Sequence, residues 1–261
     1  MSDKPIILSI AGVDPSGGAG IVADVKTIAS LDCFPVVAIT SITFQNTLGV
    51  YGAAHQSAEI LRAQIQPILD DFKIAAVKTG MLPTVEIITE VARIFNEKKL
   101  PAPVVDPVMR ATSGDSLIEE TALDTLKGQL FLIARVVTPN IPEAERLSGF
   151  AIESLDDMKR AAETIRAAGA AAVLIKGGHM PMGAKAEAVD VLLDETGNVT
   201  EFRRPYFDVG NVHGSGCTLS AAIASYLGRG KSLVDAVYEA KSYVTERIRL
   251  AQALGHGARP L

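Results

Sequence analysis

The sequence is poor in the residues that mark disulfide-rich and metal-binding proteins. It contains no tryptophan and only two cysteines, Cys33 and Cys217, which are far apart in the chain. Two cysteines cannot build a disulfide framework or a four-cysteine zinc site, so we expect reduced thiols and a cytoplasmic location. The four histidines show no close spacing of metal ligands.

Positive charge and long apolar runs are also scarce. Lys and Arg together number 25 against 30 Asp and Glu, which gives a formal net charge of -5. Proteins that bind nucleic acids need an excess of cations to neutralise phosphates, so we expect no nucleic-acid partner. No run approaches the ~18 apolar residues of a membrane helix, and the residues after Met1 lack the pattern of a signal peptide. Membrane partners are therefore not expected.

Short apolar runs alternate with helical patterns along nearly the whole chain. Strands are predicted at residues 6–11, 35–40, 74–77, 103–106, 135–138 and 172–176. Helices are predicted at residues 58–71, 85–98, 117–127, 156–168, 216–227 and 233–254, with another that ends near Leu31. Such alternation implies parallel strands joined by crossover helices that cover both faces of one sheet.

A hairpin and the lack of linkers complete the predicted architecture. Residues 189–193 and 200–204 flank a turn-forming stretch and predict an antiparallel pair at the edge of the sheet. No low-complexity segment or internal repeat marks a boundary. We predict one α/β domain over residues 1–261, a three-layer α/β/α sandwich whose mostly parallel central sheet has an antiparallel edge. In such sheets ligands bind beyond the carboxyl ends of the strands.

The strongest functional signal is Gly214-Ser215-Gly216-Cys217, which opens a helix of small residues. Free N–H groups at a helix start bind anions, and the helix dipole adds partial positive charge, so this turn suits a transferring phosphoryl group. The same dipole favours the thiolate of Cys217, which could then accept a hydroxyl proton. The alternative is a glycine-capped helix that carries a structural cysteine.

A second glycine-rich stretch, residues 12–20, follows the first predicted strand. Glycines such as Gly12 let the backbone approach a flat ring closely, and Asp24 can bind a hydroxyl or amino group of a substrate. The alternative is an ordinary strand-to-helix connection capped by Asp14 or Ser16.

Gln45 and Met81 are further candidates for contacts to a flat ring. The amide of Gln45 both donates and accepts hydrogen bonds, so it can read the amino and ring-nitrogen edge of an aminopyrimidine. Met81 can pack on the ring face, although a methionine near a strand end is also common core filling.

Four polar residues follow predicted strands at the same edge of the sheet. Asp106, and Glu143 together with Asn140, supply the oxygen ligands that Mg²⁺ prefers, although either carboxylate alone could be a helix cap. Lys176 ends a strand and is placed to bind nucleotide phosphates, or it is simply solvated. Their common edge favours a site for Mg²⁺ and ATP.

Taken together, six stretches resemble the hydroxymethylpyrimidine/phosphomethylpyrimidine kinases of thiamine biosynthesis, which belong to the ribokinase-like superfamily. The resemblance covers about residues 6–245. The stretches are residues 10–20 with Asp24, Gln45-Asn46-Thr47, Val105-Asp106-Pro107-Val108-Met109, Thr138-Pro139-Asn140, Lys176-Gly177-Gly178-His179 and Gly214-Ser215-Gly216-Cys217-Thr218.

The resemblance implies a role for each candidate residue and a homodimeric kinase. Cys217 takes the place of the aspartate base of related sugar kinases, beside an anion hole. The other implied roles are the anion hole for Gly214, Ser215 and Gly216, Mg²⁺ for Asp106 and Glu143, ATP for Lys176, Asn140 and Lys241, and the pyrimidine for Gly12, Asp24, Gln45 and Met81. The implied reaction is phosphorylation by Mg-ATP of 4-amino-5-hydroxymethyl-2-methylpyrimidine and then of its monophosphate.

The chain departs from the family pattern at positions that bear on ligand binding. Val212 stands where threonine is frequent and lacks one hydroxyl contact to phosphate. Phe44 stands where a small residue is usual, and we expect it to narrow the pyrimidine pocket.

Two other functions remain open from the sequence. A pyridoxal or pyridoxine kinase would bind a similar flat ring with a hydroxymethyl arm, but Gln45 favours the aminopyrimidine. A non-catalytic pyrimidine-binding regulatory protein would not need Asp106, Glu143, Lys176 and Cys217 together.

Overall fold

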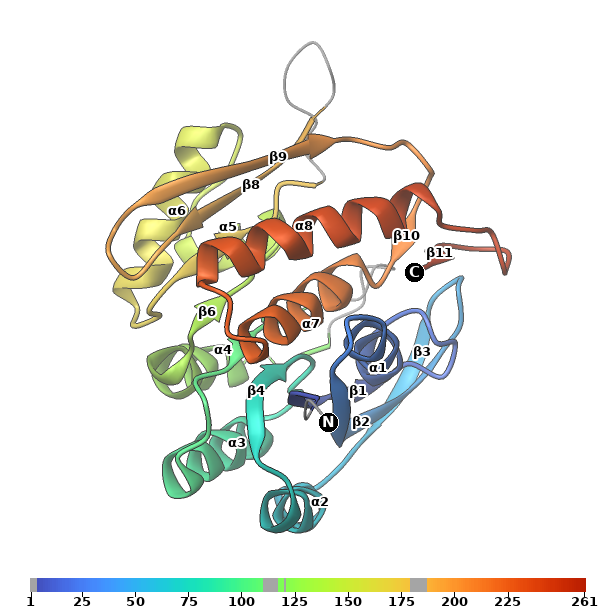
Figure 1. Ribbon diagram of the computed structural model, residues 1–261, viewed down its shortest axis with the longest axis vertical. Coiled ribbons are helices and arrows are strands. Elements are labelled where there is room, and N and C mark those ends of the chain that lie inside the picture. Colours follow the sequence, from blue (N-terminus) through green and yellow to red (C-terminus); the bar gives the residue numbers. More distant parts are fainter. Residues whose placement is uncertain (1–3, 110–116, 120, 179–186) are drawn as a thin grey trace.

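Within the described residues of the computed structural model, which are 4–109, 117–119, 121–178 and 187–261, nine strands form one sheet (Figure 1). Their spatial order is β3 (Val50–His55), β2 (Phe34–Gln45), β1 (Ile6–Val13), β4 (Ile74–Thr79), β5 (Val104–Val105), β6 (Val136–Val137), β7 (Val173–Ile175), β8 (Glu187–Leu193) and β9 (Val199–Pro205). The pairs from β2 through β7 are parallel, as predicted. The predicted hairpin is β8–β9.

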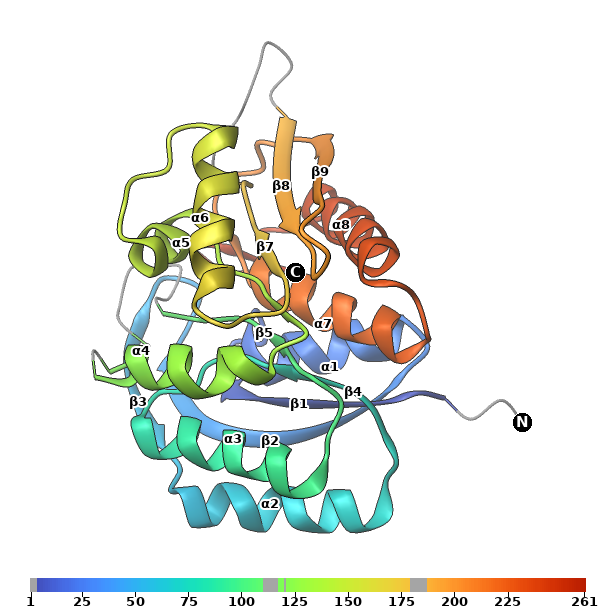
Figure 2. The same ribbon diagram turned by 90° about the vertical axis from the view of Figure 1, so that its left-hand side faces the viewer.

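Helices cover both faces of the sheet, so the predicted three-layer sandwich is confirmed (Figure 2). One face carries α1 (Gly20–Ser30), α7 (Ser215–Gly228) and α8 (Leu233–Arg249). The other carries α2 (Ala58–Asp71), α3 (Val85–Lys98), α4 (Ala122–Thr125), α5 (Ile141–Ser148) and α6 (Leu155–Ala167). None of the helices in the described ranges is long and apolar enough to span a bilayer.

The alternation of side chains along each strand explains why the strands are continuously apolar. In β1, Ile7 belongs to the core beneath α1 and α7, whereas Leu8 belongs to the core beneath α2 and α3. Val104 and Val105 of β5 divide in the same way. Because both faces of the sheet are buried, most positions of the central strands carry apolar residues, with exceptions such as Ser9 and Lys78.

Several features differ from the prediction, among them α5, which was not predicted. A second antiparallel strand, β3, extends the opposite edge of the sheet next to β2. The helix predicted at 117–127 lies partly outside the described residues, and its described part starts only at Ala122 and continues into a π-helical segment, Leu126–Leu130. The predicted helix 233–254 ends at Arg249, because the chain then turns back towards the β2–β3 turn.

That returning tail is held against both the β2–β3 turn and the active-site edge. The backbone N–H of Ala258 donates to the carbonyl of Thr47 at 2.8 Å. The last residues form β11 (Arg259–Pro260), which pairs in parallel with β10 (Val212–His213), directly before α7. The tail therefore supports the turn that precedes the α7 N-terminus.

Candidate active site

A pocket of about 410 Å³ opens at the carboxyl ends of the parallel strands, beside the N-terminus of α7. This is the edge at which open α/β sheets bind ligands. Every residue predicted for the site lines the pocket except Asp24 and Lys241. The predicted residues that line it are Gly12, Gln45, Met81, Asp106, Asn140, Glu143, Lys176, Gly214, Ser215, Gly216 and Cys217.

The N-terminus of α7 is built differently from the starts of most other helices. Ser57, Thr84 and Ser154 each accept a hydrogen bond from the first turn of α2, α3 and α6. In the described structure the N-cap of α7 is Gly214, which has no side chain that could accept such a bond. Its first N–H groups are thus left for an anion in the pocket.

Only glycine fits at position 214. Its φ is +86°, and an added Cβ would lie 1.8 Å from the carbonyl oxygen of Gly18. The turn before α7 therefore packs directly on the glycine-rich loop of residues 12–20, and the two loops form one wall of the pocket.

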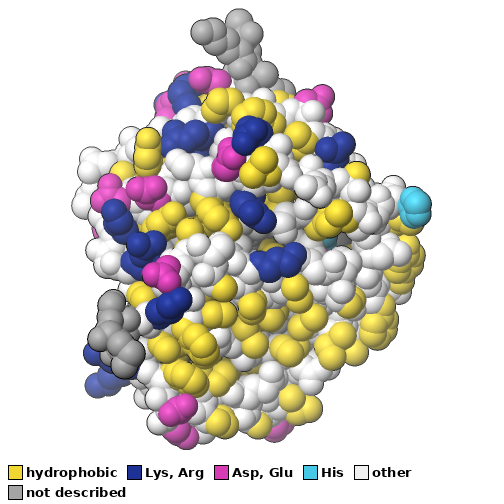
Figure 3. All heavy atoms as spheres, turned by 45° about the vertical axis from the view of Figure 1, so that its right-hand side comes forward, with side chains coloured by type: hydrophobic (Ala, Val, Ile, Leu, Met, Phe, Trp, Pro, Cys, Tyr) yellow, Lys and Arg dark blue, Asp and Glu magenta, His cyan; other side chains and the backbone are white. Residues whose placement is uncertain are grey.

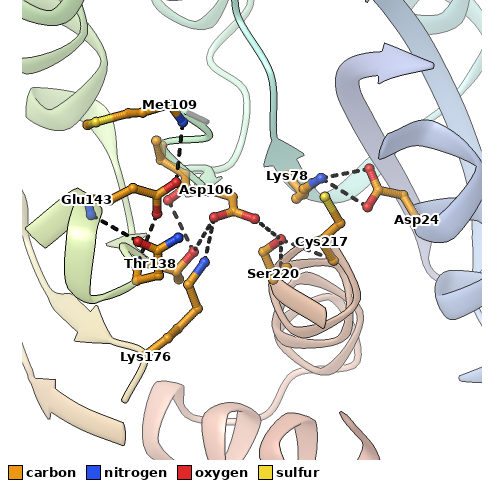
Figure 4. A network of polar contacts seen from close by, with 12 residues as sticks. Asp24, Lys78, Asp106, Met109, Thr138, Glu143, Lys176, Cys217 and Ser220 are labelled. Atoms are coloured by element: carbon orange, nitrogen blue, oxygen red, sulfur yellow. Dashed lines mark hydrogen bonds and ion pairs between the residues drawn. The ribbon is translucent and has the colours of Figure 1, made fainter. Parts of the chain in front are cut away.

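Buried charges face the α7 N-terminus across the pocket (Figure 4). Lys176 Nζ lies 2.8 Å from Asp106 Oδ1, and Ser220 Oγ of α7 donates to Asp106 Oδ2 at 3.2 Å. An added Cβ at Gly216 would lie 3.1 Å from Lys176 Nζ, so the lysine reaches the anion-binding turn itself. Burial opposes the charge on Lys176, but Asp106 and Glu143 raise its pKa, and it stays a cation.

Glu143 is placed by the start of α5. Asn140 and Glu143 form a capping box, in which the N–H of Glu143 donates to Asn140 Oδ1 and the N–H of Asn140 donates to Glu143 Oε2, both at 2.9 Å. Met109 N–H donates to the other carboxylate oxygen at 3.3 Å. Burial raises the pKa of Glu143 to about 7, and Asp106 adds to the effect while Lys176 opposes it.

Asp106 and Glu143 fit a magnesium ion that keeps most of its water shell. Both are buried oxygen donors on the wall of the pocket, and carboxylate oxygens are ligands that Mg²⁺ prefers. Within the described ranges, no group of three or more His, Cys, Asp or Glu side chains could hold a metal ion. A metal here would therefore rely on two carboxylates, water and phosphate oxygens.

Cys217 lies half-buried in the first turn of α7, beside the Lys78 ammonium (Figure 4). Burial raises the pKa of this thiol to about 11, although the charge of Lys78 lowers it. The expectation of a favoured thiolate is therefore wrong for the protein without ligands, because desolvation outweighs the helix dipole. At neutral pH the group is a thiol.

Asp24 is fully buried behind Cys217 rather than on the pocket wall. Lys78 Nζ lies 2.8 and 2.9 Å from its two oxygens, and Ser9 Oγ donates to it at 2.6 Å. Burial opposes the charge on Lys78, but Asp24 raises its pKa, so the pair is ionic. Asp24 thus holds Lys78 beside Cys217, and its predicted contact to the pyrimidine stays a prediction.

Lys241 also lies behind the pocket wall. Its Nζ is 2.7 Å from Asp190 Oδ1, and the same oxygen accepts the N–H of Gly177 at 3.0 Å. Lys241 therefore reaches the predicted ATP site through Asp190 and the loop after Lys176. His179, the last residue of the Lys176-Gly177-Gly178-His179 stretch, lies outside the described residues.

The residues predicted to contact a flat ring, Gly12, Gln45 and Met81, line the same pocket. Thr43 and Gln45 face it, whereas Phe44 points to the opposite side of β2, is 53% exposed and packs against Gly52. The expected narrowing of the pocket by Phe44 is wrong, because neighbouring side chains of a strand point to opposite faces. Met81 Sδ would lie 3.0 Å from a Cβ at Gly12, so Met81 packs closely on the backbone of Gly12.

Sequence reasoning missed Lys78, Asp14 and His213 as site residues. Lys78 is a lysine inside an apolar strand, an uncommon pattern that signals a buried partner. The sequence pattern marks Asp14 as a helix cap and gives His213 no metal-ligand spacing. Both line the pocket, and His213 Nε2 lies 2.9 Å from Asp14 Oδ2.

An anion-binding helix N-terminus that faces a lysine and two carboxylates at the end of a parallel sheet defines a small-molecule kinase of the ribokinase-like class. The chain belongs to the phosphomethylpyrimidine kinase family, whose sequence profile matches residues 14–261.

Two relatives illustrate the similarity in sequence. The chain is 42% identical over 253 residues to a hydroxymethylpyrimidine/phosphomethylpyrimidine kinase of Bacillus subtilis, covering 97% of this chain and 92% of that protein. It is also 42% identical to a thiamine biosynthesis bifunctional protein of Geobacter sulfurreducens, covering 98% of this chain and 51% of that protein.

Solved structures add a second group of relatives. A phosphomethylpyrimidine kinase from Clostridium difficile is 40% identical with a TM-score of 0.81, covering 94% of this chain and all of the other. A Bacillus subtilis pyridoxal kinase in complex with ADP is 36% identical with a TM-score of 0.89, covering 99% of this chain and 96% of the other. The similar structures thus include kinases named for a pyrimidine substrate and kinases named for pyridoxal.

Proposed function

We propose that the protein transfers the γ-phosphoryl group of ATP to the hydroxymethyl oxygen of 4-amino-5-hydroxymethyl-2-methylpyrimidine, and then phosphorylates the resulting monophosphate, in thiamine biosynthesis. The observation that carries the proposal is the uncapped N-terminus of α7 opposite Asp106, Lys176 and Glu143. Gln45, which lines the same pocket, supplies an amide for the pyrimidine edge.

The chain's own groups can position and neutralise the transferring phosphoryl group. The N–H groups of residues 214–217 bind its equatorial oxygens, and Lys176 supplies a fixed positive charge beside them. Asp106 and Glu143 would hold Mg²⁺, which would neutralise charge on the ATP phosphates. Such positioning supplies most of the rate in phosphoryl transfer, because the reaction needs little covalent help.

Cys217 handles the acceptor hydroxyl. Cys217 first releases its own proton to solvent, so the reactive form is the thiolate. The hydroxymethyl oxygen then forms the new bond to phosphorus, its proton passes to the thiolate sulfur, and the electron pair of the broken bond stays on the ADP oxygen. The ammonium of Lys78 beside Cys217 stabilises the charge-bearing sulfur, which burial otherwise disfavours. Asp24 keeps that ammonium in place.

Purified protein with Mg-ATP and the hydroxymethylpyrimidine tests the proposal directly. Chromatography with phosphorus NMR should show the monophosphate first and the diphosphate afterwards. Absence of both products, while ATP is bound, would refute the assignment. Formation of the monophosphate alone would refute the second phosphorylation.

A pyridoxal kinase is the second candidate, because structures of pyridoxal kinases from Bacillus subtilis and Staphylococcus aureus resemble this chain with TM-scores of 0.89 and 0.90. Competition between pyridoxine and the aminopyrimidine at equal concentration decides between them. The proposal requires the higher kcat/KM for the aminopyrimidine.

We also propose that the protein acts as a homodimer that pairs through the β2–β3 hairpin. Ile42, Phe44, Leu48 and Tyr51 of this hairpin are 44%, 53%, 60% and 69% exposed. β3 is an edge strand on the right of Figure 1, and hydrophobic side chains gather over the lower half of the surface that Figure 3 turns forward from that side. Apolar side chains on an exposed edge favour association.

A further inference from the structure

Lys176 leaves the backbone at a point where the peptides on both sides are held by hydrogen bonds. Its own N–H donates to the carbonyl of Pro139 at 2.8 Å. The next N–H along the chain, that of Gly177, donates to Asp190 Oδ1 at 3.0 Å. Because peptide groups are planar, these two bonds fix the backbone that flanks the Lys176 Cα and the direction in which its side chain starts. The ammonium of Lys176 then reaches Asp106 and the start of α7 from a fixed origin.

The Asp190 carboxylate binds the chain just beyond the point where the pairing of β7 with β8 stops. The last pair of this antiparallel ladder is Ile175 and Val191. Beyond it, the backbone of Gly177 approaches β8 so closely that an added Cβ would lie 2.0 Å from the carbonyl oxygen of Val189. Glycine is therefore required at position 177, and its N–H is bound by a side chain of β8 rather than by the ladder.

The Asp190 carboxylate is buried and is neutralised by Lys241 of α8. Asp190 is 2% and Lys241 6% exposed, and Lys241 Nζ lies 2.7 Å from the same Oδ1 that accepts the Gly177 N–H. Neither charged residue is among the described residues that line the pocket. A buried ion pair contributes little net stability, because the cost of desolvating two charges offsets their attraction. The geometry of the Gly177 bond therefore accounts for the pair better than stability does.

We propose that Asp190 is a positioning residue for Lys176, and that Lys241 acts on the nucleotide only through Asp190, without touching it. Lys241 holds the carboxylate against the Gly177 N–H, and that bond directs the Lys176 ammonium at the transferring phosphoryl group. Without the bond the peptide between residues 176 and 177 could rotate, and the flexible lysine would lose its fixed place beside the α7 N-terminus. This role rests on the proposed function, since it acts on the phosphoryl group that the protein transfers.

Two double variants separate the positioning bond from the charges. Asp190→Asn/Lys241→Met removes the ion pair but keeps a carbonyl oxygen that can accept the Gly177 N–H. Asp190→Leu/Lys241→Met removes the acceptor as well. We expect kcat of the Leu form to lie ~10-fold or more below that of the Asn form, because a small misplacement of a catalytic group is costly. KM for the pyrimidine should differ by less than ~3-fold between them, since neither variant changes a residue predicted to contact the ring.

Binding of a non-hydrolysable ATP analogue with Mg²⁺, measured by calorimetry, gives a readout that does not depend on the acceptor. The Leu form should bind the analogue ~10-fold more weakly than the Asn form, the effect of one hydrogen bond to a charged group. Wild-type protein that binds the analogue but phosphorylates no pyrimidine would remove the proposed function and leave this comparison in place. Equal kcat and equal analogue affinity in the two double variants would overturn the inference.

Lys176→Met provides a second comparison if thermal melts show that the Leu form does not fold. The Asn form lacks Lys241 but keeps Lys176 and its positioning bond, so its kcat should exceed that of Lys176→Met by ~10-fold or more. If Lys241 contacts the phosphates directly, the two proteins should have similar kcat values, and this result would overturn the proposal.

Discussion

At the scale of single residues, Cys217 lies under two opposed influences in the first turn of α7. Burial raises the pKa of its thiol to about 11, whereas the ammonium of Lys78 lowers it. The thiolate is therefore a minor form at neutral pH and becomes more abundant as the pH rises.

Replacing Cys217 by serine should lower kcat by ~100-fold or more and leave KM for the pyrimidine within ~3-fold, because the sulfur takes a proton only in the transition state. The wild-type kcat/KM should also rise with pH between about 7 and 10, since the thiol with a pKa of about 11 ionises progressively over this range. Initial rates at a series of pH values check both points. Unchanged catalysis in the variant would make Cys217 a packing residue.

Glu143→Gln should abolish magnesium-dependent transfer but stabilise the fold at pH 8. Burial raises the pKa of Glu143 to about 7, whereas an unfolded glutamate ionises near ~4.3. Below pH ~4.3 Glu143 is protonated in both the folded and the unfolded protein. Between the two values the unfolded chain ionises first, so stability is lost as pH rises through about 7. Glutamine removes this loss, which amounts to about 3–4 kcal/mol.

Urea unfolding at pH 4.5 and pH 8 measures the effect. The difference between Glu143→Gln and wild type should be small at the lower pH and favour the variant at the higher one. Glu163→Gln, on the exposed face of α6, serves as the control and should show no such pH dependence. A destabilised Glu143→Gln protein at pH 8 would show that the charged form of Glu143 is the one the fold favours.

At the scale of elements, the site depends on two loops that interlock. The turn at Gly214 approaches Gly18 so closely that no Cβ fits between them. The start of α5 is equally specified by its sequence, because Asn140, Pro142 and Glu143 supply a capping box and a proline in the first turn. The helix was nevertheless missed, since its short length gives little periodicity to detect.

Gly214→Ala should reduce kcat/KM by ~100-fold or more, because the added Cβ would collide with the Gly18 carbonyl and displace the anion-binding turn. Gly230→Ala is the matched control: Gly230 also has a positive φ, +83°, but open space around its Cβ position. That variant should lose only about 1 kcal/mol of stability from backbone strain and keep its activity. Steady-state kinetics and thermal melts of the two proteins separate strain from collision. Equal activities would contradict the interlocking of the loops.

At the scale of the whole molecule, the sequence predicted the layers and the β8–β9 edge but missed the β3 edge. The central strands are apolar on both faces, so their pattern shows up as continuous runs such as residues 172–175. β3 contains Gly52 and exposed residues such as Tyr51, so it lacks an alternating signal. The polar residues at the ends of the central strands do line one pocket at the predicted edge of the sheet. The sequence did not show that Asp24 and Lys241 lie behind the wall of this pocket, because the burial of a side chain depends on packing.

The exposed hairpin gives the molecule its last testable property. Wild-type protein should have a mass in solution of twice 27.5 kDa, and Phe44→Asp should reduce it to the mass of one chain, because a carboxylate would be buried in an apolar interface. Val199→Asp on β9, at the opposite edge of the sheet, changes an equally apolar residue that is 42% exposed and should leave the dimer intact. Light scattering coupled to size-exclusion chromatography measures all three proteins. A monomeric wild type would refute the dimer. A dimer broken by Val199→Asp and not by Phe44→Asp would place the interface away from the β2–β3 hairpin.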